Sequence, residues 1–319
     1  MVYEISAISK IQYIVLVHFR RDEHDNCHRT NNTDSRTLVE TTNRGGKIMA
    51  ESHSAFIGEI PRNYEKYLGP LIFSEYAVDL ANRITVPTGG ALLETAAGTG
   101  MATRQLRDSI SQDVRIVATD LNEDMLAVAR GKFEGSENIE FQIADALDLP
   151  FDDATFEAVA CQFSVMFFPD KLLSLQEAAR VLKPGGKFNF NIWDSFEHNH
   201  LIQTVNKTIA ECLPDNPPDF FNVPYGYYEI DVIKNLLFEA GFADIEISVL
   251  PRISATDEAR DVAMGYVMGS PVRLQIEQFD PGSLSKIVDA VEHAVGKEFG
   301  YKSVKAKMQA MVFTAHYLG

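Results

Sequence analysis

The sequence has 319 residues, of which 45% are hydrophobic and 23% charged, a composition typical of a globular protein with enough apolar material for a large core. The net charge of -16 and a pI near 4.9 disfavour a nucleic-acid partner, because such a surface needs Lys and Arg facing the phosphates. Cys27, Cys161 and Cys212 are widely spaced and form no CxxC motif. This sparse, odd set favours three free thiols in a reducing compartment over disulfides or a zinc site, so we expect no metal.

No apolar run approaches the roughly 20 residues that span a bilayer, so the sequence predicts no stable membrane insertion. The longest apolar run near the N-terminus is Ile11–Phe19, which leads into the charged segment 20–23 without a small-residue cleavage site. This pattern disfavours a signal peptide. Together with the free thiols, it favours a cytoplasmic location.

Residues 1–50 differ in composition from the rest of the chain. They hold seven basic and six acidic residues, a net charge of +1, so the remaining residues carry -17. Between Arg20 and Lys47 the chain is polar and shows neither a helical nor a strand period. Such a composition cannot bury enough apolar surface to offset the entropy of ordering. We therefore expect a disordered extension over 1–50, or translation from Met49, and one folded domain over 51–319.

From about Phe56 the sequence becomes periodic. Aromatic and aliphatic residues between Tyr64 and Ala81 recur at helical spacing, which predicts one or two helices. Short apolar runs then alternate with helical patterns, giving predicted strands at 91–96, 115–120, 139–144, 156–163 and 187–193, and helices at 101–109, 122–133 and 171–182. Strands separated by single helices indicate βαβ units and a parallel sheet.

After Asp194 the pattern becomes looser and richer in proline. It predicts a helix at 230–240, a strand at 245–250, two helices at about 257–277 and 284–298, and a last strand at 308–317. We interpret residues 252–300 as a helical insertion between the last two strands, lying over one edge of the sheet.

The strongest chemical motif is a glycine-rich turn between the first strand and its helix. Its residues are Leu92-Leu93-Glu94-Thr95-Ala96-Ala97-Gly98-Thr99-Gly100. The glycines let a ligand approach the backbone, and the helix N-terminus offers free N–H groups. A dinucleotide site with the pattern GxGxxG is the rival interpretation. Thr103 stands at its third position, which disfavours a dehydrogenase.

Acidic residues end three successive predicted strands, at Glu94, Asp120 and Asp145. The carboxyl ends of parallel strands meet at one edge of the sheet, where α/β proteins bind their ligands. A carboxylate at Asp120 suits the ribose hydroxyls of an adenosine, and one at Asp145 suits the adenine amine. For Asp120 the alternative is an N-cap for the following helix. The three acids together favour an adenosine ligand.

At this point the segment from about Phe56 to Tyr317 resembles a class I S-adenosylmethionine-dependent methyltransferase of the type 11 (UbiE-like) group. The motifs that carry the resemblance are the glycine turn 94–100, Thr119-Asp120-Leu121-Asn122-Glu123-Asp124-Met125, Ala144-Asp145-Ala146, Leu149-Pro150-Phe151 and Arg180-Val181-Leu182-Lys183-Pro184-Gly185-Gly186. The resemblance implies an α/β fold, a Rossmann-like three-layer sandwich whose seven-stranded, mostly parallel sheet has an antiparallel last strand. N-terminal helices would precede the sheet, and S-adenosyl-L-methionine would be the cofactor.

The resemblance also implies roles for individual residues. The glycine turn would hold the methionine end of the cofactor, Asp120 the ribose, and Asp145 with Ala146 the adenine. Met125 would pack on the adenine, while Gln162 and Phe163 would border the sulfonium and the substrate. The full set of predicted cofactor-binding residues is Glu94, Ala96, Gly98, Gly100, Asp120, Leu121, Met125, Asp145, Ala146 and Gln162. One departure is Ala96, which stands where the family usually has its first glycine.

The acceptor end of the site is less constrained by sequence. Methyl transfer is an in-line displacement from an activated donor, so a general base is needed only if the acceptor must lose a proton. His198 and His200 are candidate bases, and two surface histidines at a helix start are the alternative. Aromatic residues predict an apolar pocket, with core packing as the alternative interpretation. The predicted pocket residues are Tyr64, Phe163, Phe167 and Tyr227.

The sequence thus favours a small-molecule methyltransferase that acts on oxygen or carbon. A cofactor-binding module without catalysis, acting in an assembly, is the second hypothesis, and an NAD-dependent oxidoreductase is the third. Fold does not fix substrate, so the acceptor, the methylated atom and the oligomeric state stay open.

Overall fold

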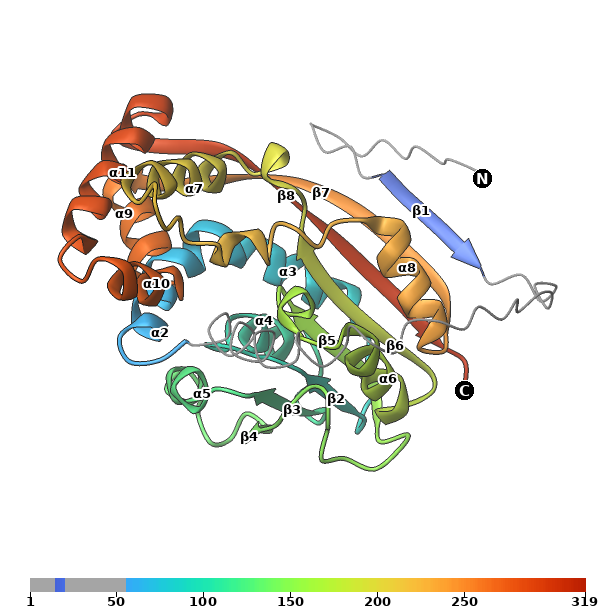
Figure 1. Cartoon of the computed structure of the whole chain (residues 1–319). Helices are drawn as coiled ribbons and strands as arrows, with labels where there is room; N and C mark the ends of the chain where they lie inside the picture. Colours follow the sequence, from blue (N-terminus) through green and yellow to red (C-terminus); the bar gives the residue numbers. More distant parts are fainter. Residues whose placement is uncertain (1–14, 21–55) are drawn as a thin grey trace, which may run out of the picture.

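An eight-stranded sheet runs through the part of the chain that the computed structural model describes, residues 15–20 and 56–319 (Figure 1). The strand order is β1-β7-β8-β6-β5-β2-β3-β4. The strands are β1 (Val15–Arg20), β2 (Ala91–Glu94), β3 (Arg115–Asp120), β4 (Ile139–Ile143), β5 (Phe156–Gln162), β6 (Leu182–Trp193), β7 (Phe242–Glu258) and β8 (Lys302–Tyr317).

The sheet has a parallel centre and an antiparallel flank. Strands β4, β3, β2, β5 and β6 pair in parallel, and β8 runs antiparallel between β6 and β7. Seven of the strands therefore form the mostly parallel sheet with an antiparallel last strand that the sequence predicted. Apolar residues on both faces of the central strands are buried, as parallel sheets covered by helices require.

Helices cover the sheet. The long helices are α3 (Ser74–Arg83), α4 (Met101–Ser109), α5 (Glu123–Arg130), α6 (Lys171–Val181), α7 (His200–Cys212), α8 (Ile230–Glu239), α10 (Val272–Phe279) and α11 (Leu284–Phe299). The chain crosses from β2 to β3 through α4 and from β5 to β6 through α6, in opposite directions along the sheet. Right-handed crossovers therefore put α4 and α6 on opposite faces. Helix α3 packs with α4, and α8 with α6.

A helical insertion lies between the last two strands, as the sequence predicted, but its bounds and its position differ from the prediction. Strand β7 continues to Glu258 and β8 begins at Lys302, so the helical part spans 259–299 rather than about 252–300. It consists of α9 (Ala259–Ala263), a π-helical turn η5 (Met264–Met268), α10 and α11. These helices pack on α7 and on the N-terminal π-helix η1 (Tyr64–Phe73), near the short helix α2 (Ile60–Asn63), and not over a sheet edge (Figure 1).

Strand β1 lies within the segment 1–50 that was expected to lack structure. It pairs antiparallel with the edge strand β7, from Val15 opposite Val249 to Arg20 opposite Asp244. The ammonium group of Lys234 lies over the ring of Phe19, 4.4 Å from its centroid, within the range of a cation–π contact. The other residues of 1–50 lie outside the described part, so the division of the chain at residue 50 stays a prediction. No helix in the described ranges is long and apolar enough to cross a membrane.

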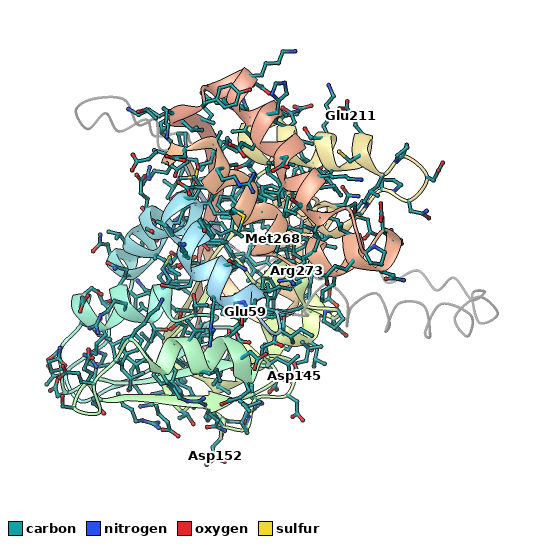
Figure 2. The ribbon with its side chains drawn as sticks, turned by 90° about the vertical axis from the view of Figure 1, so that its left-hand side faces the viewer. Glu59, Asp145, Asp152, Glu211, Met268 and Arg273 are labelled. Atoms are coloured by element: carbon teal, nitrogen blue, oxygen red, sulfur yellow. The ribbon has the colours of Figure 1, made fainter. Side chains whose placement is uncertain are left out.

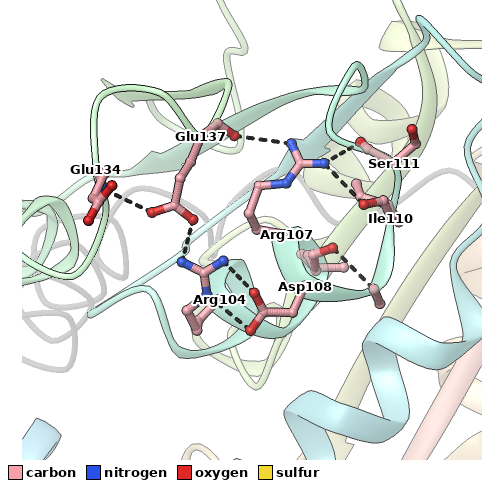
Figure 3. A network of polar contacts seen from close by, with 9 residues as sticks. Arg104, Arg107, Asp108, Ile110, Ser111, Glu134 and Glu137 are labelled. Carbon is pink, nitrogen blue, oxygen red and sulfur yellow. Dashed lines mark hydrogen bonds and ion pairs between the residues drawn. The ribbon is translucent and has the colours of Figure 1, made fainter.

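A buried arginine fixes the edge of the sheet opposite the carboxyl ends of the strands. The side chain of Arg107, on α4, is 0% exposed. Its guanidinium donates to the carbonyl oxygen of Val114 (2.8 Å). It also donates to those of Glu137 (3.2 Å), Ile110 (3.2 Å) and Ser111 (Figure 3). Its neighbour Arg104 bonds the carboxylates of Asp108 and Glu137 (Figure 3). One side chain thus satisfies carbonyls in the loops before β3 and β4.

We expect Arg107→Met to lower the free energy of unfolding by about 2–4 kcal/mol, because it leaves buried carbonyl oxygens without donors. The matched control is Arg130→Met, which removes only a half-exposed ion pair with Glu123 and should cost about 1 kcal/mol or less. Urea unfolding of both variants measures the difference. Equal destabilisation of the two would contradict the anchoring role of Arg107.

Candidate cofactor and acceptor site

A cavity of about 890 Å³ opens at the carboxyl ends of the parallel strands. Its walls come from the loops after β2, β3, β4 and β5, from the end of β6, from η1, and from residues 220–225 and 266–270. This is the edge of the sheet at which α/β proteins bind ligands. Figure 2 shows Asp145 below α2, with Met268 and Arg273 of the insertion above it.

The glycine turn forms the first wall. Ala96 has a φ of 52°, Gly98 of 57° and Gly100 of 77°, so alternate residues adopt the left-handed conformation. Ala96 pays a steric cost there that glycine would avoid. Gly98 lines the cavity, whereas a Cβ at Gly100 would lie 2.9 Å from the Cβ of Ala129. Gly98 therefore gives the ligand access to the backbone, and Gly100 allows α4 to start close to α5.

Asp120 joins the loops after β2 and β3. Its Oδ2 accepts a hydrogen bond from the Gly98 amide (2.8 Å), and its Oδ1 accepts one from the Asn122 amide (2.8 Å). The carboxyl group is 7% exposed and lines the cavity. Burial raises its pKa, and the bonds from Asn122 and Gly98 oppose that shift. Each carboxylate oxygen has a second lone pair, so Asp120 can hold its loops and also accept from a ligand.

The remaining polar rim continues along β3 and β4. Leu121, Met125, Asp145 and Ala146, which the sequence analysis named as candidate cofactor-binding residues, line the cavity. The side chain of Asp145 accepts a hydrogen bond from the Leu147 amide (2.9 Å), which shapes the loop after β4. This half of the cavity therefore offers two carboxylates, backbone groups and the flat apolar contact of Met125.

The other half of the cavity is aromatic. Phe163 follows β5 and stacks on Trp193 at the end of β6, with ring centroids 4.0 Å apart and planes at 12°. Trp193 also stacks on Tyr225 (5.6 Å, 21°). Phe163 has a φ of 50°, a strained conformation for a non-glycine residue. Its amide donates to both the carbonyl and the side-chain oxygen of Asn191, which holds it in place.

Two π-helical segments cover this aromatic half. Segment η1 contributes Tyr64 and Phe73, and η5 contributes Tyr266. The segments approach closely because of glycines in and after η5: a Cβ at Gly269 would lie 2.9 Å from the Tyr64 amide nitrogen, and one at Gly265 would lie 3.1 Å from Leu68. The insertion is therefore packed directly on the N-terminal helices that close the site.

The structure brings most of the predicted site residues together. Those that line the cavity are Ala96, Gly98, Asp120, Leu121, Met125, Asp145, Ala146, Gln162, Tyr64, Phe163 and Phe167. Glu94 and Gly100 lie behind the lining, and Tyr227 packs instead beside Lys171, whose ammonium lies 4.9 Å from its ring centroid. His198, in a 3-10 turn, and His200, the first residue of α7, do not line the cavity. Both histidines lie at a helix start, which is where the alternative interpretation, two surface histidines, places them.

Several lining residues were not among the predicted site residues. They include Phe56, Phe73, Asn122, Trp193, Tyr225, Tyr266 and Ser270. Trp193 could have been predicted as a site residue, because it ends a predicted parallel strand at the edge of the sheet where ligands bind. Tyr225 belongs to the aromatic cluster seen in the sequence, but Tyr266 and Ser270 reach the cavity through the packing of the insertion, which no local pattern reveals.

Comparisons with solved structures identify the fold as that of methyltransferases. The Bacillus halodurans protein BH2331 matches 77% of this chain and 100% of its own with a TM-score of 0.51 and 22% identity. A phosphoethanolamine N-methyltransferase of Haemonchus contortus, solved with S-adenosylhomocysteine, matches 81% of this chain and 57% of its own (TM-score 0.51, 18% identity). At these identities the likeness establishes the fold alone.

The sequence comparisons agree with the fold. Residues 74–214 match the ubiE/COQ5 methyltransferase family, so in this segment the chain is similar to S-adenosylmethionine-dependent methyltransferases. A demethylmenaquinone methyltransferase of Staphylococcus epidermidis is 29% identical over 210 residues, 60% of this chain and 85% of the relative. A UbiE C-methyltransferase of ubiquinone and menaquinone biosynthesis from Idiomarina loihiensis is 34% identical over 168 residues, 52% of this chain and 58% of the relative.

Glu94 gives a prediction for pH dependence. It is 1% exposed, its Oε2 accepts a hydrogen bond from the Thr103 hydroxyl (2.6 Å), and its Oε1 has no hydrogen-bond partner in residues 15–20 and 56–319. Burial raises its pKa to about 8. The folded state therefore keeps this proton up to about pH 8, whereas the unfolded chain releases it near the ordinary value of 4.5. Between these values the free energy of unfolding falls as the pH rises.

We expect this fall to reach up to about 1.4 kcal/mol per pH unit between pH 6 and pH 8, and Glu94→Gln to remove it. Urea unfolding across this range measures the slope. The control is Glu211→Gln, an exposed site on α7 that lies far from Asp145 in Figure 2 and should leave the slope unchanged. A slope that persists in Glu94→Gln would show that another group binds the proton.

Proposed function

We propose that the protein transfers a methyl group from S-adenosylmethionine to a planar, largely apolar small molecule, onto oxygen or carbon. The observation that carries the proposal is one continuous cavity whose polar half, around Asp120, meets its aromatic half at Gln162 and Phe163. The polar half suits the cofactor and the aromatic half suits an acceptor with a ring system.

The residues of the polar half fit the cofactor. Thr99 Oγ1 and Gln162 Oε1 are buried, belong to residues that line the cavity, and have no hydrogen-bond partner among the described residues. Buried polar atoms are normally satisfied, so these two call for a polar ligand. Gln162 is oriented by its Nε2, which donates to the Phe73 carbonyl (3.2 Å). In this proposal Asp120 accepts from the ribose hydroxyls, and Asp145 with Ala146 holds the adenine.

When bound, the cofactor supplies a methyl group on a sulfonium sulfur, which is already activated for displacement. The chain then has to hold the acceptor in line and keep water away. The stacked rings of Phe163 and Trp193 provide a rigid apolar wall for this purpose. Burial raises the pKa of Tyr64, Tyr225 and Tyr266, so the tyrosines that line the cavity stay protonated and do not serve as bases at neutral pH. Positioning is therefore the main contribution of the protein.

The names of the relatives support a planar acceptor. The Staphylococcus epidermidis relative is a demethylmenaquinone methyltransferase, and the Idiomarina loihiensis relative is a C-methyltransferase. Demethylmenaquinone, as a flat ring system, is therefore the first acceptor to try with this chain. The residues beyond 214 that line the acceptor half lie outside the segment matched to the family, which leaves room for a different acceptor.

Calorimetric titration of the full chain with S-adenosylmethionine tests the cofactor half. We expect binding, and a loss of tenfold or more in affinity for Asp120→Asn, because hydrogen bonds to a charged group contribute about 1.5–3 kcal/mol. Asp152→Asn is the matched control, an exposed aspartate that Figure 2 places at the lower end of the molecule, and it should bind as the unmodified protein does.

Turnover completes this test. Incubation with the cofactor and demethylmenaquinone, followed by mass spectrometry, should show transfer of one methyl group if the acceptor is a quinone. A protein that does not bind S-adenosylmethionine would refute the proposal. Binding without turnover on any of a panel of planar phenols, quinones and ketones would refute its acceptor part.

A further inference from the structure

Two buried tyrosines meet in the aromatic half of the cavity. Tyr225 lies after a 3-10 turn (Phe220–Asn222), and Tyr266 lies in η5 of the insertion. Each is 3% exposed, each lines the cavity, and Tyr266 is near enough to raise the pKa of the Tyr225 hydroxyl further, beyond the larger effect of burial. Both residues lie outside the segment 74–214 that matches the methyltransferase family. The pair is therefore a feature of this chain's own acceptor half.

The pair has a hydrogen-bond donor to spare. Each phenol carries one hydroxyl hydrogen, and a bond between the two phenols would use only one of them, so at least one hydrogen is left for a third group. Burial raises the pKa of both hydroxyls, which keeps them protonated and therefore donors at neutral pH. A buried donor is costly to leave unpaired, so a ligand that supplies an acceptor atom gains from it.

Other hydroxyl groups in this half are already committed. The Ser164 hydroxyl donates to the Gln162 carbonyl (3.1 Å), and the Ser270 hydroxyl donates to the Tyr266 carbonyl (2.6 Å). Tyr64 lies near both Asp120 and Tyr225, where the two halves of the cavity meet. Farther from the cofactor half, the Tyr225–Tyr266 pair offers a side-chain donor to an acceptor molecule.

The pair also stands at the far end of a row of stacked rings. Phe163, which borders the cofactor half, stacks on Trp193, and Trp193 stacks on Tyr225. A planar molecule held at the tyrosine pair would therefore lie along the aromatic wall, with its other edge toward Gln162 and Phe163. This placement fixes which edge of the ring faces the methyl donor.

We propose that the Tyr225–Tyr266 hydroxyl pair anchors the methyl acceptor by donating a hydrogen bond to a carbonyl or phenolic oxygen on its ring system. This inference rests on the proposed function and assigns the two tyrosines as specificity-determining residues. They select ring compounds that carry an oxygen at the edge opposite the methylated position over hydrocarbons of the same shape.

The test compares two probes of one shape, 1-tetralone, a bicyclic aromatic ketone, and tetralin, the same ring system without the carbonyl. Each is titrated calorimetrically into the full chain saturated with S-adenosylhomocysteine. We expect 1-tetralone to bind about tenfold more tightly than tetralin, the effect of one hydrogen bond. Tyr266→Phe or Tyr225→Phe should reduce this preference to about twofold while leaving tetralin affinity unchanged. Tyr228→Phe, at a more exposed tyrosine outside the cavity lining, should keep the full preference.

The outcomes separate this inference from the proposed function. Binding of S-adenosylhomocysteine is measured first, and its absence would count against the cofactor site itself. With that binding in place, equal affinity for the two probes, no binding of either, or a ketone preference that survives in both Phe variants would overturn the anchoring role of the tyrosines. The Phe variants keep the buried rings, and their urea unfolding midpoints check that they remain folded.

Discussion

The carboxylate of Asp120 bonds two loops at once, the turn after β2 through the Gly98 amide and the turn after β3 through the Asn122 amide. The two loops follow β2 and β3, which are neighbouring parallel strands. The relative position of the loops therefore depends on the register of these strands and on the Asp120 side chain. The left-handed conformations at Ala96 and Gly98 are part of the same arrangement, because they turn the first loop toward Asp120. A cofactor that bonds Asp120 would therefore meet a site whose walls are already fixed, which lowers the entropic cost of binding.

The two halves of the cavity come from different parts of the chain. The parallel strands and their loops build the polar half, and the family segment 74–214 contains it. The acceptor half depends on residues after 214, and the insertion reaches it because Gly265 and Gly269 allow η5 to lie against η1. A fold of this kind can keep its cofactor site while the insertion changes the acceptor, in line with the rule that function lies in sites grafted on folds.

Much of the fold could be predicted from the sequence, for identifiable reasons. Helix α4 (Met101–Ser109) and strand β3 (Arg115–Asp120) have the predicted bounds. In both, a clear hydrophobic period ends at residues that interrupt a helix or a strand. Strand β7 was predicted to end at Leu250, but pairing with β8 carries it to Glu258 through residues that alternate without a long apolar run. Helix α7 was not among the predicted elements, and β1 overlaps a short apolar run whose pairing with β7 no local pattern reveals.

The candidate site, like the fold, could be predicted from the sequence only in part. Residues at strand ends, such as Asp120 and Asp145, could be predicted to converge because parallel strands end at one edge. Gly100 was predicted to contact the cofactor. In the structure it instead allows α4 to pack closely on α5. Tyr266 could not be predicted, because its place in the cavity depends on how a distant insertion packs.

The most direct measurement is a crystal structure of the full chain with S-adenosylhomocysteine. The account predicts that the ribose hydroxyls lie within hydrogen-bond distance of the Asp120 carboxylate, with the adenine beside Met125 and Asp145. It also predicts that the sulfur faces the aromatic half at Phe163. A ligand bound elsewhere, or one whose ribose does not contact Asp120, would contradict the account.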